Sequence, residues 1–78
     1  MERAQVVSEI TEIVNEILDI EITDIENVKR EDIEEWDSLE HINIILAIEE
    51  NFGIKFQIDE LKTVTEPIGI INKVMEMV

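Results

Sequence analysis

Hydrophobic residues recur with helical spacing in the first part of the chain. Between positions 3 and 18, apolar side chains return every three or four residues, and glutamates occupy the opposite face. This spacing predicts a first helix over residues 3–18. The apolar face of that helix consists of Val6, Ile10, Ile13, Val14 and Ile17.

The segment from 19 to 36 has no sustained period. Ile20–Ile22 alternate as in a β-strand, and isoleucine favours strands, but no partner strand is evident. We therefore expect a long ordered loop that can include one short helical turn, with Trp36 packing the loop against the rest of the molecule. The apolar side chains expected to pin this loop are Ile20, Ile22, Ile25, Val28, Ile33 and Trp36.

A second long helix is predicted from Ser38 to Asn51. Asp37 stands at its N-cap position, where the carboxylate can accept hydrogen bonds from first-turn N–H groups. Glu40, three residues later, completes the spacing of a capping box. Gly53 supplies the stop signal, because glycine readily adopts the left-handed conformation that ends a helix.

This second helix carries apolar residues on two different sides. Successive residues are about 100° apart, and the arc expected to face the core contains His41, Ile44, Ile45, Ile48 and Phe52. The second arc contains Leu39, Ile42 and Leu46, with Glu49 between the arcs and Asn43 and Glu50 on its other side. Two interpretations remain open: four-helix packing buries both arcs, or the second arc stays exposed inside an acidic rim as a docking surface.

Two further helices complete the expected fold. A short one is predicted over Ile58–Lys62, and Thr65 is expected to cap the last one, with Glu66 and Pro67 in its first turn. The apolar face of the last helix is assigned to Ile68, Ile71, Val74, Met75 and Val78. The predicted fold class is all-α: a small four-helix bundle of three longer helices and one short one, with a long loop after the first helix.

The composition limits what the chain can be. Its 78 residues allow one small domain, residues 1–78, and the 45% of hydrophobic residues argues for a folded chain despite the charge. Six basic residues against 20 acidic ones give a net charge of -14, which argues against nucleic-acid and anionic-membrane partners and favours basic protein patches.

The sequence has no apolar leader, no membrane-length segment and no cysteine, and we expect a cytoplasmic monomer. No stretch has EF-hand spacing, so no metal site is predicted.

Ser38 is the residue with the most specific chemical context. Its simplest role is structural, since serine is common where helices begin. A catalytic pair with His41, three residues later, is rejected because the chain has no second histidine, no orienting group and no evident oxyanion site. We therefore expect no catalytic residues and no enzymatic activity.

The residues around this serine carry a family resemblance. The run Trp36-Asp37-Ser38-Leu39, followed by a helix that ends Ile48-Glu49-Glu50-Asn51-Phe52-Gly53-Ile54, resembles the acyl carrier protein family. That family is similar to this chain in its Asp-Ser-Leu motif at the start of the second helix, its Glu-Glu-x-Phe-Gly-Ile ending, its size, its acidity and its long first loop. The resemblance covers nearly the whole chain.

The resemblance implies a function and a set of residues. Ser38, flanked by Asp37 and Leu39, would carry 4′-phosphopantetheine, installed from coenzyme A and Mg²⁺ by a phosphopantetheinyl transferase. The terminal thiol would hold acyl groups as thioesters and shuttle them between acyl-transferring enzymes with basic docking patches, in fatty-acid or specialised acyl or polyketide-type biosynthesis and lipid metabolism. The implied partner surface consists of Leu39, Glu40, Ile42, Asn43, Leu46, Glu49 and Glu50.

Some positions depart from the family pattern. Many members have glycine two residues before the aspartate, where this chain has Glu35, and the following Trp36 looks like carriers outside housekeeping fatty-acid synthesis. Asn43 removes one acid from the partner-facing rim. The Gly-Gly-containing motif of peptide-synthetase carriers is absent, which ranks an aminoacyl or peptidyl carrier below an acyl carrier. The alternative from another class is an unmodified acidic helical protein-interaction module.

Overall fold

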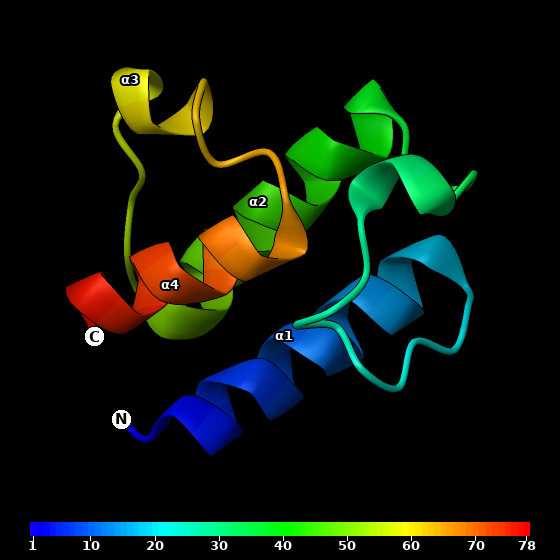
Figure 1. Cartoon of the computed structure of the whole chain (residues 1–78). Helices are drawn as coiled ribbons and strands as arrows, with labels where there is room; N and C mark the ends of the chain where they lie inside the picture. The colour runs from blue at the N-terminus through cyan, green and yellow to red at the C-terminus, as the bar shows by residue number, and fades with distance from the viewer.

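The computed structural model describes residues 1–78 as an all-helical chain (Figure 1). The helices are α1 (Arg3–Leu18), the 3₁₀ turn η1 (Arg30–Asp32), α2 (Ser38–Phe52), α3 (Ile58–Leu61) and α4 (Pro67–Met77). This confirms the predicted class, a small helical bundle with three longer helices, one short one and a long first loop. None of its helices has both the length and the apolar character needed to cross a membrane.

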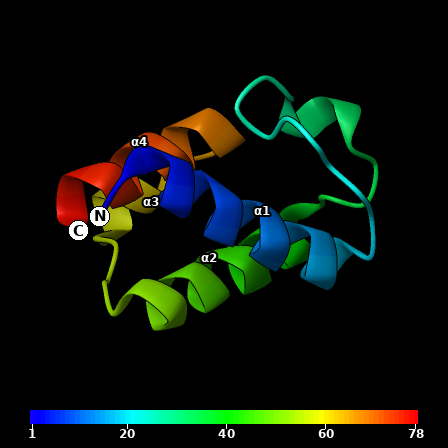
Figure 2. The same ribbon diagram turned by 90° about the horizontal axis from the view of Figure 1, so that it is seen from below.

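α1 ends without the glycine that usually marks a helix C-terminus. Asp19 adopts the left-handed conformation instead, with φ of 54°, and its N–H donates to the carbonyl of Asn15. The buried face of α1 packs against both α2 and α4, and α1 and α2 lie side by side in Figure 2. The two chain termini lie at the same end of the bundle in both views.

A single hydrophobic cluster fills the space between the helices. It contains side chains from all three longer helices and from the connecting segments, and no charged or polar side chain is buried with them. The members are Val6, Ile10, Val14, Leu18, Ile25, Trp36, Ile44, Ile45, Ile48, Phe56, Val64, Ile70, Ile71 and Val74. Burial of this apolar surface, at about 25 cal/mol per Å², is the main favourable contribution to folding.

The first loop is ordered and held at several points, as expected. Ile25 and Trp36 are fully part of the core, at 1% and 3% exposure. The amide of Asn15 adds a contact that the sequence pattern did not indicate, since it donates to the carbonyl of Ile22 and accepts from the N–H of the same residue. Arg3 on α1 also pairs with Glu26, at 3.0 Å. The loop therefore has a fixed path from α1 to Ser38.

The start of α4 was predicted one residue too early. Glu66, not Thr65, is the N-cap residue, its side chain does not cap the helix, and Pro67 is the first helical residue. The predicted apolar face was also partly wrong, because Ile68 and Val78 are exposed and Ile70 is fully buried. With the helix beginning at Pro67, the face centred on that residue points to the core, and Val78 lies beyond the last turn of the helix.

α3 ends at Leu61, one residue before the predicted end, with Lys62 as its C-cap. It is tied to α4 by an ion pair between Glu60 and Lys73. The hydrogen bond from the Lys73 ammonium lowers the pKa of the Glu60 carboxyl, and the same bond raises the pKa of Lys73. Both groups are at the surface, where such pairs contribute little to stability.

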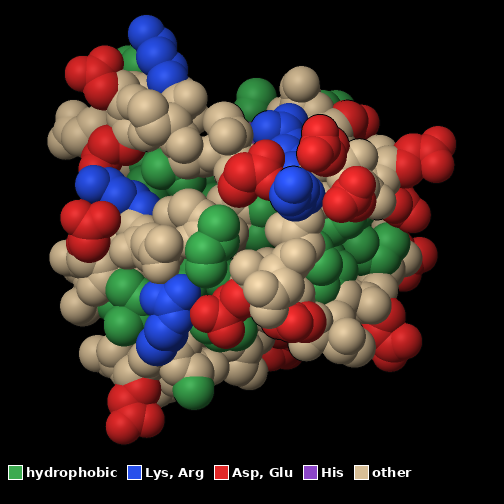
Figure 3. Space-filling model, in the orientation of Figure 1, with side chains coloured by type: hydrophobic (Ala, Val, Ile, Leu, Met, Phe, Trp, Pro, Cys, Tyr) green, Lys and Arg blue, Asp and Glu red, His purple; other side chains and the backbone are tan.

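The acidic side chains remain at the surface. On the face shown in Figure 3 they lie both along the outline and across the middle of the molecule, with lysine or arginine side chains beside several of them. No group of three or more acidic or histidine side chains is placed so that it could hold a metal ion. The negative charge is therefore distributed and not gathered into one site.

Candidate functional site

Ser38 is the first residue of α2 and its side chain is exposed. The loop reaches it through the buried Trp36, and Asp37 then caps the helix: its Oδ1 accepts from the N–H of Glu40 at 2.8 Å. An aspartate at this position contributes about 0.5–2 kcal/mol to helix stability. The core-anchored loop and the cap together fix where the serine hydroxyl is presented.

The second half of the predicted capping box does not form. The Asp37 N–H donates to the carbonyl of Glu35 and not to the side chain of Glu40. Glu40 instead accepts from the Asn43 amide, at 2.8 Å, one turn further along the exposed face. The spacing alone could not show this, because Asn43 competes for the same carboxylate.

Two backbone N–H groups at this end of α2 have no hydrogen-bond partner within the chain, those of Ser38 and Leu39. Free N–H groups and the positive end of the helix dipole favour an anion here. The Asp37 carboxylate is a second negative charge nearby and opposes part of that attraction. The donor set is therefore of the kind that accepts a phosphate, with one counteracting charge.

The second apolar arc of α2 is exposed, which decides between the two interpretations of this helix. Leu39 is 68% exposed, and Ile42 and Leu46 are each 56% exposed. The first arc faces the core as predicted: Ile44, Ile45 and Ile48 are buried. We call the exposed set Leu39, Ile42 and Leu46 the apolar face of α2. Exposed large aliphatic side chains in a row along one helix are typical of a protein-binding surface.

The four polar residues assigned to the rim of this face have different roles in the fold. Glu50 is exposed and no other group of the chain bonds to its carboxylate. Glu40 and Asn43 bond to each other. Glu49 is partly buried, and its Oε2 accepts from the N–H of Phe56 at 2.7 Å, which ties α2 to the segment that leads to α3.

A small hollow adjoins the apolar face. Its volume is about 200 Å³ and its surface is mostly apolar, with Leu61 of α3 on one side and Ile42 and Leu46 of α2 on the other. Leu61 was not assigned to the site from the sequence, because the four-residue helix α3 is too short to show a periodic face. The hollow extends the apolar face of α2 toward α3.

His41 is partly buried and both of its ring nitrogens are engaged. The indole N–H of Trp36 donates to His41 Nδ1 at 2.9 Å, and His41 Nε2 lies 3.2 Å from the carbonyl oxygen of Val64. This confirms the predicted packing and hydrogen-bonding role of the histidine. Neither nitrogen remains to accept a proton from Ser38.

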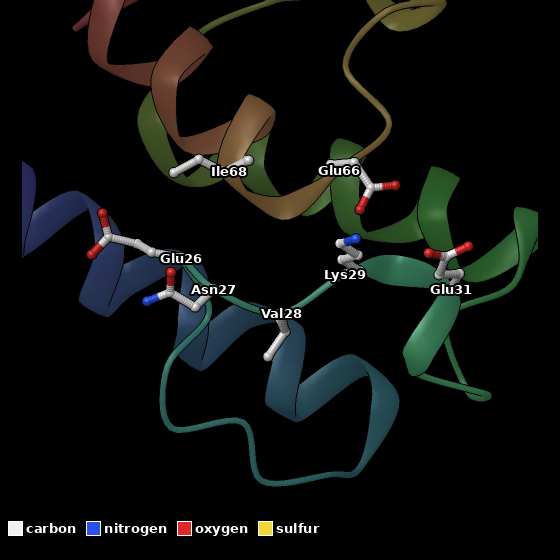
Figure 4. A pocket seen from close by; sticks show the side chains of 7 residues that line it. All are labelled: Glu26, Asn27, Val28, Lys29, Glu31, Glu66 and Ile68. Atoms are coloured by element: carbon white, nitrogen blue, oxygen red, sulfur yellow. The ribbon is translucent and has the colours of Figure 1, made fainter.

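The largest hollow of the molecule, about 390 Å³, lies away from Ser38, between the first loop and the start of α4 (Figure 4). It is an open depression in which five of the seven lining residues are polar or charged, and none of the candidate residues lines it. Its lining residues are Glu26, Asn27, Val28, Lys29, Glu31, Glu66 and Ile68. One of its acids, Glu66, has a structural role, because its Oε1 accepts from the N–H of Arg30 at 3.0 Å.

The predicted site residues therefore form one continuous surface. Asp37, Ser38 and Leu39 begin it, and Ile42, Asn43, Leu46 and Glu50 continue it along the exposed side of α2. Comparisons of the chain with protein-family models, with curated proteins and with solved structures found no match.

Proposed function

We propose that this chain is a carrier protein whose Ser38 bears 4′-phosphopantetheine and holds acyl groups for other enzymes to act on. The observation that carries the proposal is the placement of Ser38: an exposed hydroxyl at the first residue of α2, preceded by an anchored loop and followed by an exposed apolar face. The Asp37-Ser38-Leu39 motif, similar to that of acyl carrier proteins, supports the same assignment.

The residues around Ser38 suit a phosphodiester. The free N–H groups of Ser38 and Leu39 are donors to an anionic oxygen at the helix start. Because the serine is exposed and Asp37 supplies the cap, joining the hydroxyl to phosphorus would remove no hydrogen bond on which the helix depends. The negative charge of Asp37 opposes the phosphate, so the attached group is expected to extend away from that carboxylate.

The group would supply a thiol on a flexible arm, which is the acyl attachment point that the chain itself lacks, since it has no cysteine. The protein's own contribution is presentation and recognition. The loop and the Asp37 cap hold the serine in a fixed position, and the rest of α2 identifies the carrier to its partners. The chain's one histidine has both ring nitrogens engaged, by Trp36 and by Val64, which fits a carrier that is acted upon by enzymes.

The apolar face of α2 is the proposed docking surface for the transferase and the acyl-transferring enzymes. Leu39, Ile42 and Leu46 would form the centre of the contact, and the surrounding acids would attract a basic patch during approach. Glu50 is the acid that is free to pair with a partner, whereas Glu49 is held by the backbone of Phe56. The net charge of -14 favours basic partners of either class.

The same surface would also suit an unmodified interaction module, the second candidate function. Its exposed leucines and isoleucine would then bind a partner without any attached group. The two functions differ in one respect that can be measured, namely whether Ser38 is a substrate for a phosphopantetheinyl transferase.

The proposal is tested by intact mass spectrometry of the chain after incubation with coenzyme A, Mg²⁺ and a transferase of broad specificity. We expect the mass to increase by one phosphopantetheinyl group per chain, with no second addition. A known carrier protein in a parallel reaction controls for transferase activity. If the control is fully modified and this chain is unchanged, the carrier function is refuted and the interaction module is favoured.

A further inference from the structure

The ring of His41 joins three parts of the fold that are distant in the sequence. It lies on α2, receives the indole N–H of Trp36 from the first loop, and contacts the carbonyl of Val64 between α3 and α4. The two rings are 6.0 Å apart between centroids. The chain has one histidine and one tryptophan, so this contact can be followed without interference from any other pair.

The hydrogen bonds fix the tautomer of the histidine. An indole N–H can only donate, so Nδ1 of His41 must be the acceptor and carry no proton. In the neutral ring the proton is then on Nε2, which donates to the Val64 carbonyl oxygen. The Trp36 indole N–H, the His41 ring and the Val64 carbonyl therefore each have the hydrogen-bond partner that they need. Only the neutral ring satisfies all three groups.

A second proton on the ring would break the hydrogen bond with Trp36 and leave the one with Val64 intact. Protonated Nδ1 would face the indole N–H of Trp36 as donor against donor, at a separation that is now a 2.9 Å hydrogen bond. Trp36 is 3% exposed, so its N–H could recover a partner only if the indole moved toward water. Trp36 is two residues before Ser38, so any such movement acts on the segment that leads into α2.

We propose that the Trp36–His41–Val64 contact is a pH-sensitive latch: a proton on His41 releases Trp36 and loosens the loop segment 33–37 ahead of Ser38. The latch is a property of the fold and does not require that Ser38 be modified. It goes beyond the carrier function by assigning a conformational role to the loop. This structure shows the closed form of the latch, in which the Trp36 N–H is hydrogen-bonded to His41.

The charges around the ring come from several elements. Arg30 of η1 makes a long hydrogen bond from Nε to the Trp36 carbonyl, at 3.5 Å, and Glu66 stands at the N-cap of α4. On α2 itself, Glu49 lines the same hollow as His41, with its carboxylate bonded to Phe56. On α3, Glu60 is paired with Lys73 of α4.

These surroundings set the direction of the pH dependence. Burial lowers the pKa of His41 below its ordinary value of 6.5, the charge of Arg30 lowers it further, and the bond to Val64 and the charge of Glu66 oppose the change. A lowered pKa in the folded state means that the unfolded chain takes up the proton first as the pH falls. The stability that the neutral ring provides is therefore complete above pH 6.5 and is lost as the pH falls through the lower folded value.

The test follows His41 and Trp36 together by NMR in the unmodified chain between pH 7.5 and 5. We expect the His41 ring protons and the Trp36 indole N–H resonance to titrate with one shared midpoint below 6.5, and the tryptophan fluorescence to shift to the red with the same midpoint. The ¹⁵N shifts at pH 7.5 should show the proton on Nε2.

Two variants separate the latch from general effects of acid. His41→Gln keeps an acceptor and a donor but cannot titrate, so its Trp36 signals should be flat over the same range. Trp36→Phe removes the opposing N–H, so His41 should titrate at a higher pH than in the wild type. The latch is excluded if the Trp36 signals of the wild type do not change as His41 titrates, or if they change equally in His41→Gln. Because the wild-type titration needs no variant and no transferase, these outcomes are independent of whether Ser38 is modified.

Discussion

Replacing Ser38 by Ala is expected to abolish modification completely while leaving the fold intact. The hydroxyl is the proposed attachment point, and no other residue between 33 and 42 has a hydroxyl side chain. Because Asp37 and not Ser38 caps the helix, the free energy of unfolding should change by no more than about 0.5 kcal/mol. Intact mass after the transferase reaction measures the first effect, and thermal unfolding followed by circular dichroism measures the second.

The chain offers a matched control for this substitution. Its only other serine, Ser8, is also exposed but lies inside α1, away from the start of any helix. Ser8→Ala should be modified as fast as the wild type. Modification that persists in Ser38→Ala, or that disappears in Ser8→Ala, would place the attachment point elsewhere and remove the basis of the site described here.

The second large effect concerns the two apolar arcs of α2. Ile48→Ala should lower the free energy of unfolding by about 2–5 kcal/mol, because Ile48 is fully buried and the truncation leaves a cavity. The total free energy of unfolding of a small domain is roughly 5–15 kcal/mol, so this variant should be close to unfolding at ordinary temperature. Leu46→Ala removes the same number of carbon atoms from a side chain that is 56% exposed, and its stability should change by no more than about 0.5 kcal/mol.

Leu46→Ala should be impaired in its reaction with the transferase instead of in its stability. Leu46→Ala should remain folded and be modified more slowly at limiting transferase, because the centre of the proposed docking surface is reduced. Urea unfolding curves and initial modification rates, measured on both variants, distinguish these effects. A strongly destabilised Leu46→Ala would mean that the second arc belongs to the core, and a normal rate in a folded Leu46→Ala would place the docking surface elsewhere.

Much of the fold could be predicted because the apolar residues of the long helices follow a clear period. Helix α1 has the predicted limits, and α2 extends to Phe52, one residue beyond its predicted end. The last helix was harder, because Ile68, Ile70 and Ile71 are all isoleucine and the side chains alone do not show which of them face the core. The packing of α4 against α1 decides this, and it places Ile70 and Ile71 on the inside.

The candidate site was predictable to a similar degree. There is a physical reason why some of its features could not be predicted from the sequence. The sequence pattern identified Asp37, Ser38 and the second arc of α2, since these lie on one regular helix. The exposure of that arc could not be decided from periodicity, because it depends on where α1, α3 and α4 lie. Contacts between distant segments, such as those of Glu49 with Phe56 and of His41 with Val64, were not visible for the same reason.

The most direct test of the carrier function is a count of free thiols before and after the transferase reaction. The chain has no cysteine, so a thiol reagent should detect no thiol in the purified protein, and every thiol found on the chain after coenzyme A and the transferase are removed must come from an attached group. We predict one thiol per chain after reaction with coenzyme A and Mg²⁺, and its loss when an acyl-coenzyme A replaces coenzyme A as the donor. A thiol count that stays at zero, while a control carrier protein in the same reaction gains one thiol, would contradict the carrier function.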